Sequence, residues 1–237
     1  MSSTFRSQAL VLDRVPYKDY DRIYTLLTLE RGLVRARAKG AMRSKAKVRP
    51  HLEGLGLVDV MLVQGKGGYI LASAEMTEPV RMRSLESQLL AITAERVLGR
   101  ALREAYPDRE VFDLALSFLK DLSHLGEADK FTLKCMEIHF FWSLLGHLGY
   151  NGSLDKCNLC GHELHGAIKF VPAVGAFFCG PCTNSASVIV TEDIRAFLKN
   201  RTSSNLLPKS KLGEFYQALK EHFSHRLEIS YPALAIA

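Results

Sequence analysis

Up to about residue 80 the chain alternates between short apolar runs and clusters of charged residues or glycines. Five of these runs cover residues 8–15, 21–30, 33–40, 55–65 and 68–76. Runs of this length, rich in valine, leucine and isoleucine and bounded by glycine or aspartate, are typical of β-strands. Five or six short strands within about 80 residues predict a small closed barrel.

From Ser84 onward the apolar positions recur at helical intervals. Ser84 can cap a helix whose apolar positions lie four, three and four residues apart, at Leu90, Ala94, Val97 and Ala101. Further helices are predicted over residues 108–123, 129–150 and 211–229. The segment 129–150 is apolar almost all round and contains the only tryptophan, so we expect it to be a buried central helix.

The change of period predicts a domain boundary near residues 78–84. We expect an α+β protein in which residues 1–80 form an oligonucleotide-binding (OB) barrel and residues 81–237 form a mainly α-helical domain. Of the 237 residues, 47 % are hydrophobic and 24 % charged, which is ordinary for a globular protein. No run approaches the ~18 apolar residues of a membrane span, and the start resembles no secretory signal, which favours a cytoplasmic protein.

Four cysteines form two Cys-x2-Cys pairs separated by 18 residues: Cys157, Cys160, Cys179 and Cys182. Two thiolates two residues apart can bind one face of a tetrahedral ion, and the second pair can close the other face. Four sulfur ligands leave no position for water, so we predict one structural Zn²⁺ per chain and no catalysis by it. The ligands would define a zinc-ribbon-like module at residues 155–183, inserted in the helical domain.

The cysteines and their neighbours also allow other interpretations. The "CGPC" pair alone also matches the redox motif of thioredoxins, but the residues after it read as a turn and a strand instead of a helix. His162 and His165 are spare ligands close to the pairs, although both are more typical of surface residues. Cys135 lies in the apolar segment 129–150, and we interpret it as a core residue.

The stretch "VRARAKGAMRSKAKVRP", residues 34–50, contains no acid and seven cations: Arg35, Arg37, Lys39, Arg43, Lys45, Lys47 and Arg49. If two strands surround "GAM", the cations of each strand share one face, about 6.8 Å apart. That spacing is close to two phosphate steps of ~3.4 Å. Residues 1–83 carry a net charge of +7 and the remainder −1. We therefore predict a phosphate-binding, sequence-independent DNA surface, at which arginine and lysine should be nearly interchangeable.

A solvated edge strand is the alternative interpretation of this stretch, because charged edges deter aggregation. No aromatic residue lies between positions 25 and 68, so the stretch itself provides no stacking platform for bases. Tyr17, Tyr20 and Tyr69 are the nearest stacking candidates, although each also fits the packing of a barrel.

Several segments resemble the bacterial recombination mediator RecO family. They include "YDRIYTLLT", Gly32 and "AKGA" at the front, "FFWSLLGHLGYNGSLDKCNLCG", "FFCGPC" and the terminal "LKEHFSHRLEIS". The resemblance implies an OB barrel followed by a helical domain that often carries zinc. It also implies binding of single- and double-stranded DNA, strand annealing, and loading of RecA with the partner RecR onto DNA coated by the single-stranded DNA-binding protein SSB. A nucleoid-associated protein of the bacterial cytoplasm follows from this.

The resemblance also has departures. "GYNGSL" lacks a proline that many relatives have after the tyrosine, and many members lack the cysteines. The zinc is therefore expected to support the structure and not the shared function.

Alternatives of other functional classes remain open at this point. The chain has no Gly-rich phosphate loop, no His-Glu-x-x-His and no nucleophile elbow, so we predict that it is not an enzyme. A metal-dependent nuclease would need carboxylates such as Asp13, Asp19 and Asp21, which more often start turns. A zinc-ribbon adaptor or transcription-type protein would need a basic zinc module, whereas cations and acids are balanced there.

The acidic C-terminal tail of SSB requires a docking surface that combines cations with apolar groups. The last predicted helix provides Leu212, Phe215 and Phe223 beside Lys211, Lys220 and Arg226. We hypothesise that the tail docks there, although the apolar residues also fit a core.

Overall fold

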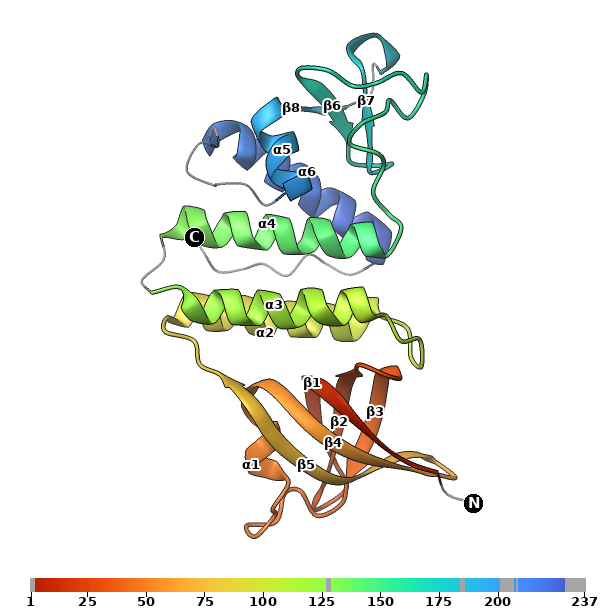
Figure 1. Cartoon of the computed structure of the whole chain (residues 1–237), viewed down its shortest axis with the longest axis vertical. Helices are drawn as coiled ribbons and strands as arrows, with labels where there is room; N and C mark the ends of the chain where they lie inside the picture. The colour runs from red at the N-terminus through yellow and green to blue at the C-terminus, as the bar shows by residue number, and fades with distance from the viewer. Residues whose placement is uncertain (1–2, 127–128, 184–185, 201–206, 208, 229–237) are drawn as a thin grey trace. The chain divides into compact units, whose positions relative to one another are not determined.

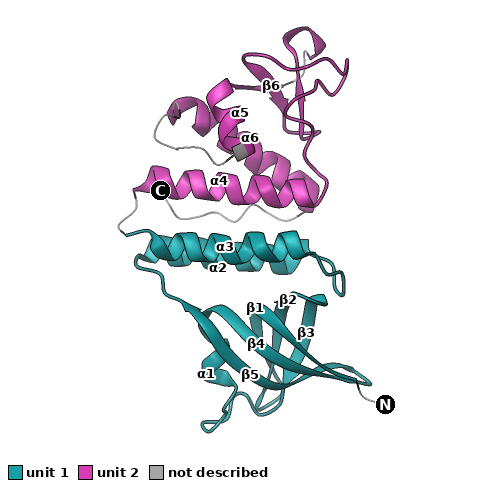
Figure 2. Cartoon of the chain, viewed as in Figure 1, with its two compact units in different colours: residues 1–127, 234–237 teal, residues 128–233 magenta. Residues whose placement is uncertain are grey.

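The computed structural model describes residues 3–126, 129–183, 186–200, 207 and 209–228 of the chain. It divides into two compact units, of which the first runs over residues 1–127 and the second over residues 128–233 (Figure 2). None of the helices within the described ranges is long and apolar enough to cross a lipid bilayer.

A closed barrel of five strands begins the first unit (Figure 1). Around the barrel the strands follow the order β1 (Thr4–Tyr17), β2 (Asp21–Thr28), β3 (Gly32–Ala38), β5 (Gly68–Val80) and β4 (Leu55–Gly65). Neighbouring strands pair antiparallel, except that β3 and β5 pair in parallel through Ala36–Tyr69 and Arg37–Ile70. The five strand segments predicted from the sequence are confirmed.

The barrel is filled by alternate residues of its strands. Its buried core consists of Ala9, Val11, Tyr24, Leu26, Val34, Ala36, Ala38, Ala41, Leu52, Val58, Val60, Leu62 and Leu71. Some outward residues of the strands are buried as well, among them Leu10, Leu12 and Leu27. The reason is that two helices cover part of the outer surface: α2 (Leu85–Ala101) contacts β1 and β2, and α3 (Arg109–His124) contacts β4 and β5.

Both of these helices begin where their capping residues predict. The side chain of Ser84 accepts a hydrogen bond from the backbone N–H of Ser87 at 3.1 Å, and that of Asp108 accepts one from Val111 at 3.0 Å. Each bond satisfies an N–H group that the first helical turn leaves without a partner. The change from strands to helices falls between Val80 and Leu85, but the compact unit continues through α3.

The second unit is built around α4 (Lys130–His147), which contacts α5 (Glu192–Asn200) and α6 (Lys209–Leu227). It also contains a sheet of the order β7 (Ala176–Phe178), β6 (Ile168–Val171) and β8 (Val188–Val190), and the 3-10 turn η1 (Gly180–Cys182). The ring of Trp142 meets those of Phe170, Phe177 and Phe215 edge-on at 5.6–6.0 Å. The predicted buried central helix is thus confirmed. The last helix ends at Leu227, and residue 229, its predicted end, lies outside the described residues.

Candidate nucleic-acid interface and metal centre

The outer face of β3 carries the first cations of the basic stretch. Val34, Ala36 and Ala38 are buried in the barrel, while the side chain of Arg35 is 63 % exposed and that of Arg37 is 34 % exposed. The alternation follows from the pleat of a strand, which points successive side chains to opposite faces. The strand alternation predicted for Arg35 and Arg37 is confirmed, whereas Lys39 lies in the turn just after β3.

The second strand predicted over residues 43–49 is wrong. These residues form turns and bends, in which the N–H of Arg43 donates to the carbonyl of Gly40 at 3.0 Å, and the short helix α1 (Arg49–Leu52) follows. Pro50 has the backbone angle of a first helical turn and no N–H for a sheet. Ser44 and Ala46 between the cations give a strand little apolar surface to bury, although Val48 packs against the barrel core.

Three of the seven cations are paired with acids from other parts of the chain. The Nε of Arg35 lies 3.0 Å from a carboxylate oxygen of Glu104, and that of Arg49 lies 3.6 Å from Glu53. Arg37 pairs with Asp21. All three acids come from outside the stretch. Within the described residues, Lys39, Lys45 and Lys47 are exposed and form no ion pair.

Asp21 holds the start of the basic turn in place. Its carboxylate accepts hydrogen bonds from the backbone N–H of Gly40 at 2.7 Å and from the Nε of Arg37 at 2.6 Å. These bonds, the backbone one first, lower the pKa of Asp21 below its ordinary value of 3.8. From the sequence, Asp21 was expected only as a turn residue or as a nuclease ligand. Its position directly after the β1–β2 turn was the available signal.

Two tyrosines next to the cations are exposed, although a place in the barrel core was the other possibility for them. Tyr17 is 38 % exposed and Tyr20 is 55 % exposed. The guanidinium of Arg37 lies 5.2 Å from the centre of the Tyr17 ring, and that of Arg43 lies 5.3 Å from the Tyr20 ring. These are distances of cation–π contacts. Tyr69 instead packs edge-on against Phe5 at 5.5 Å.

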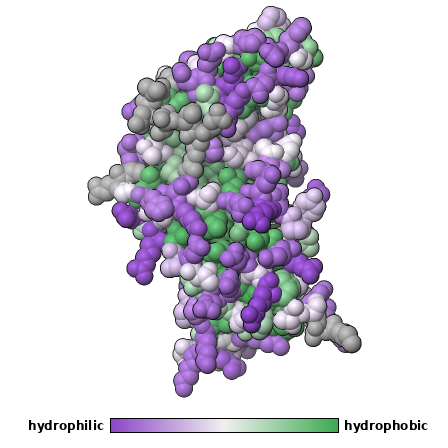
Figure 3. Space-filling model, in the orientation of Figure 1, coloured by the Kyte–Doolittle hydropathy of each residue, from purple (hydrophilic) through white to green (hydrophobic). Residues whose placement is uncertain are grey.

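We call the outer side of β3, with Tyr17, Tyr20 and the turn at residues 39–48, the basic face. It combines arginines, lysines and open aromatic rings, which together suit phosphates and unpaired bases. Figure 3 shows one side of the molecule, on which hydrophilic side chains project from the lower end of the barrel.

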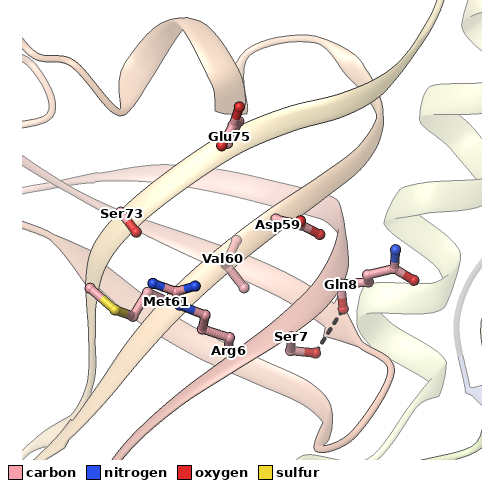
Figure 4. A pocket seen from close by; sticks show the side chains of 8 residues that line it. All are labelled: Arg6, Ser7, Gln8, Asp59, Val60, Met61, Ser73 and Glu75. Carbon is pink, nitrogen blue, oxygen red and sulfur yellow. Dashed lines mark hydrogen bonds between the residues drawn. The ribbon is translucent and has the colours of Figure 1, made fainter.

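A groove of about 410 Å³ lies on another part of the barrel, over β1, β4 and β5 (Figure 4). Its lining includes Arg6, but also Asp59 and Glu75, which face each other across β4 and β5. Two like charges at directly opposed positions repel each other and repel phosphate. The groove is therefore unsuited to an anion, which leaves the basic face as the candidate interface of the barrel.

The four predicted ligand cysteines come together in the second unit. Their sulfur atoms all lie within 4.8 Å of one another, and the sulfurs of Cys160 and Cys179 are 3.9 Å apart. Zn–S bonds of about 2.3 Å in a tetrahedron separate the sulfurs by about 3.8 Å. The residues present therefore fit a tetrathiolate metal site and could hold one ion.

The backbone around the sulfurs is shaped for ionised thiols. The N–H of Gly161 donates to the carbonyl of Cys157, and the N–H of Cys182 to that of Cys179, which closes two tight turns. Gly161 has a φ of +73°, which glycine adopts without strain. Burial opposes ionisation of Cys157, but backbone N–H groups directed at its sulfur outweigh burial and lower its pKa to about 6.

The two histidines near the cysteines, Cys135 and the last helix contribute nothing to the sulfur cluster. His162 and His165 are exposed and do not belong to the sulfur cluster. Cys135 is 3 % exposed, and burial raises its pKa to about 11, as fits a core residue. The docking surface hypothesised on the last helix is not available, because its three apolar members are fully buried: Leu212, Phe215 and Phe223.

Comparison with known proteins first gives the class, that of DNA repair proteins. A "DNA repair protein RecO" of Geobacter metallireducens is 37 % identical over 185 residues, which cover 77 % of this chain and 73 % of that protein. Proteins of the same name from Rubrobacter xylanophilus and Geobacter sulfurreducens are 32 % and 30 % identical, over 77 % and 88 % of this chain and 73 % and 87 % of their own lengths.

The family models give the same answer for the two parts of the chain. The model "Recombination protein O N terminal" matches residues 1–80, and "Recombination protein O C terminal" matches residues 83–234. The chain belongs to the RecO family of DNA repair and recombination proteins. The resemblance found in the sequence is thereby confirmed.

Proposed function

We propose that the protein is a non-catalytic DNA-binding mediator of recombinational repair, and that it binds single- and double-stranded DNA at the basic face. The observation that carries this proposal is the pairing of cations with open aromatic rings, Arg37 with Tyr17 and Arg43 with Tyr20. The cations would meet phosphates and the rings would stack on unpaired bases. The seven cations of the stretch, from Arg35 to Arg49, would supply the phosphate contacts.

We further propose that the barrel is an OB fold. The order of its strands and the parallel closure between β3 and β5 support this assignment. In OB folds, oligonucleotides bind across strands 2 and 3 and the loops that join strands 1–2 and 4–5. Here the first of these loops contains Lys18 and Tyr20, and the second contains Lys66. Residues 1–80 would be the DNA-binding domain and residues 81–237 the helical domain.

Strand annealing follows from the same surface without any chemical step. A face that neutralises the phosphates of one strand and presents its bases lowers the repulsion that a complementary strand meets. In this proposal the protein assists RecR in loading RecA onto DNA coated by SSB, and it works at the nucleoid in the cytoplasm. It neither hydrolyses nucleotides nor cleaves DNA.

The four cysteines would hold a structural Zn²⁺ in a module at residues 155–183. Bound zinc supplies four strong bonds to sulfur that join the two Cys-x2-Cys turns. The fit of the sulfur spacing and the directed backbone N–H groups support this part of the proposal.

The experiment that tests the DNA-binding proposal is a salt series on a variant in which Lys39, Arg43, Lys45 and Lys47 are changed to alanine. If the four cations contact phosphates of single-stranded DNA, the negative slope of log affinity against log salt should become shallower by roughly 3 in the variant, at about 0.7 per phosphate. A control removes the same charge from the second unit, at Lys130, Lys156, Lys209 and Lys211. Wild-type affinity and slope in the first variant would refute the basic face as the DNA site.

A further inference from the structure

The connection between α2 and α3 is fixed against the first residues of β3. The N–H of Ala105 donates to the carbonyl of Leu33 at 3.0 Å. Gly32 has a φ of +65°, and a Cβ at this position would lie only 2.1 Å from the carbonyl oxygen of Tyr106. Ala105 itself has a φ of +59°, which is unusual for a residue with a side chain. The connection is therefore held in one defined conformation beside the barrel.

This connection and the end of α2 expose a group of side chains that resembles the basic face. Tyr106 is 74 % exposed, although a tyrosine normally buries much of its ring. Arg96 and Arg100, four residues apart on α2, are exposed, as is Arg103 just after the helix. None of the three arginines forms an ion pair in the part of the chain that the structure describes.

The packing of the helices shows which side of α2 the arginines occupy. Arg96 and Arg100 lie on the side of α2 opposite to its buried residues, such as Leu90 and Ala94. Just after α2, Glu104 pairs with Arg35 of β3 and the N–H of Ala105 donates to Leu33 at the start of β3. The C-terminal end of α2 and Arg103 therefore adjoin the basic face, and Arg100 and Arg96 lead away from it along the helix.

An ion pair lies at the boundary between the basic face and the exposed side chains at the end of α2, and we call this boundary the seam. The Nε of Arg35 on β3 lies 3.0 Å from a carboxylate oxygen of Glu104, and both side chains are about three-fifths exposed. An exposed pair of this kind contributes little stability and can open at low cost. A strand of DNA that crosses the seam would meet Arg35 on one side and Tyr106 on the other.

We propose that Arg96, Arg100, Arg103 and Tyr106 form a second half of the single-stranded DNA site, which we call the α2 extension. This inference rests on the proposed function of the basic face. The strand would follow β3 from the Tyr20 end to the Tyr106 end. The seven residues of β3 span about 23 Å at ~3.3 Å each, or about seven phosphate steps of ~3.4 Å. Bases would stack on tyrosines at both ends, while arginines of α2 bind the phosphates beyond the seam.

The test compares short and long oligothymidines on the full-length protein. Tyr106→Ala should weaken binding of a 20-nucleotide strand about tenfold, and Tyr106→Phe should restore it, because phenylalanine keeps the stacking ring. Changing the three arginines to glutamine should make the negative slope of log affinity against log salt shallower by roughly 2, at about 0.7 per phosphate. A strand short enough to lie on the basic face alone should be insensitive to all of these changes. Arg109→Gln, which removes an exposed arginine paired with Asp113, is the matched control.

A substitution that is expected to strengthen binding of the long strand complements these variants. Glu104→Gln removes the acid at the seam and should tighten binding of the long strand about twofold to fivefold, without an effect on the short one. If the tyrosine and arginine variants bind the long strand as the wild type does, while variants of the basic face bind it weakly, the α2 extension is refuted and the proposed function stands. If variants of the basic face also bind normally, the proposed function itself fails.

Discussion

Glu95 on α2 is a buried carboxyl group between the helix and the barrel, and it predicts a pH dependence of stability. Its residue is 4 % exposed, and no hydrogen bond to it is found among the described residues. Burial raises its pKa from 4.5 to about 8, against the weaker opposing effect of the Arg14 charge. At neutral pH the folded protein therefore holds this carboxyl mostly protonated, whereas the unfolded chain has it ionised.

The sign and size of the effect follow from proton linkage. Between pH 4.5 and 8 the folded state binds more protons at this site than the unfolded state, so stability falls as the pH rises. The interval from 4.5 to about 8 corresponds to about 5 kcal/mol in total, at about 1.4 kcal/mol per pH unit. Glutamine has nearly the same shape and no charge. We expect Glu95→Gln to match the wild type at pH 4.5 and to be more stable by several kcal/mol at pH 8.5.

Hydrogen exchange followed by mass spectrometry is the suitable assay, because it reads peptides of α2 and β1 separately. Fluorescence of Trp142 would report on the second unit instead. Glu86→Gln, an exposed change on the same helix, is the control and should show no gain that grows over this pH range. A difference between Glu95→Gln and wild type that stays constant from pH 4.5 to 8.5 would refute the reasoning.

Two further predictions concern Gly32, where the α2–α3 connection contacts the start of β3, and the sulfur cluster. Gly32→Ala should lower the free energy of unfolding of the first unit by at least about 2 kcal/mol in urea titrations, because its Cβ would clash with backbone. Gly40→Ala has the same φ of +65° but meets only a flexible arginine side chain at 3.5 Å, so equal losses in both variants would contradict the clash. Purified wild type should contain one Zn²⁺ by elemental analysis and the double change Cys157→Ser, Cys160→Ser none, with faster exchange over residues 155–183 and unchanged exchange in α2. A metal-free wild type would argue against the zinc site.

Local patterns in the sequence were sufficient to predict much of the fold. The strand alternation around Arg35 and Arg37 and the caps at Ser84 and Asp108 depend on neighbouring residues alone. The turn of each Cys-x2-Cys pair was also predictable from its spacing. In each of these cases the physical cause lies within a few residues of its effect. The meeting of the two pairs across 18 residues was predicted from what a tetrahedral metal ion requires.

The partners of the basic residues could not be predicted in the same way. Glu104 reaches Arg35 only because the α2–α3 connection docks on β3, and Asp21 reaches Arg37 only across the β2–β3 pair. Such contacts depend on tertiary structure, which no local pattern encodes. The prediction of a second strand over residues 43–49 was wrong for a related reason. Charges alternate there, but the residues between them provide too little apolar surface to form a buried face.

The contacts of the arginines revise the expectation that arginine and lysine are interchangeable on the basic face. Arg37 is held by Asp21 and lies over a tyrosine ring, and Arg43 lies over another ring, so both depend on the planar guanidinium. Lys45 and Lys47 stand on turns, exposed and without ion pairs among the described residues, and they contribute charge alone. A lysine at position 37 or 43 would keep the charge but lose the stacking geometry. If the basic face is the proposed DNA site, it combines arginines that protein contacts already order with lysines that would adapt to the bound strand, which would suit binding to strands of any sequence.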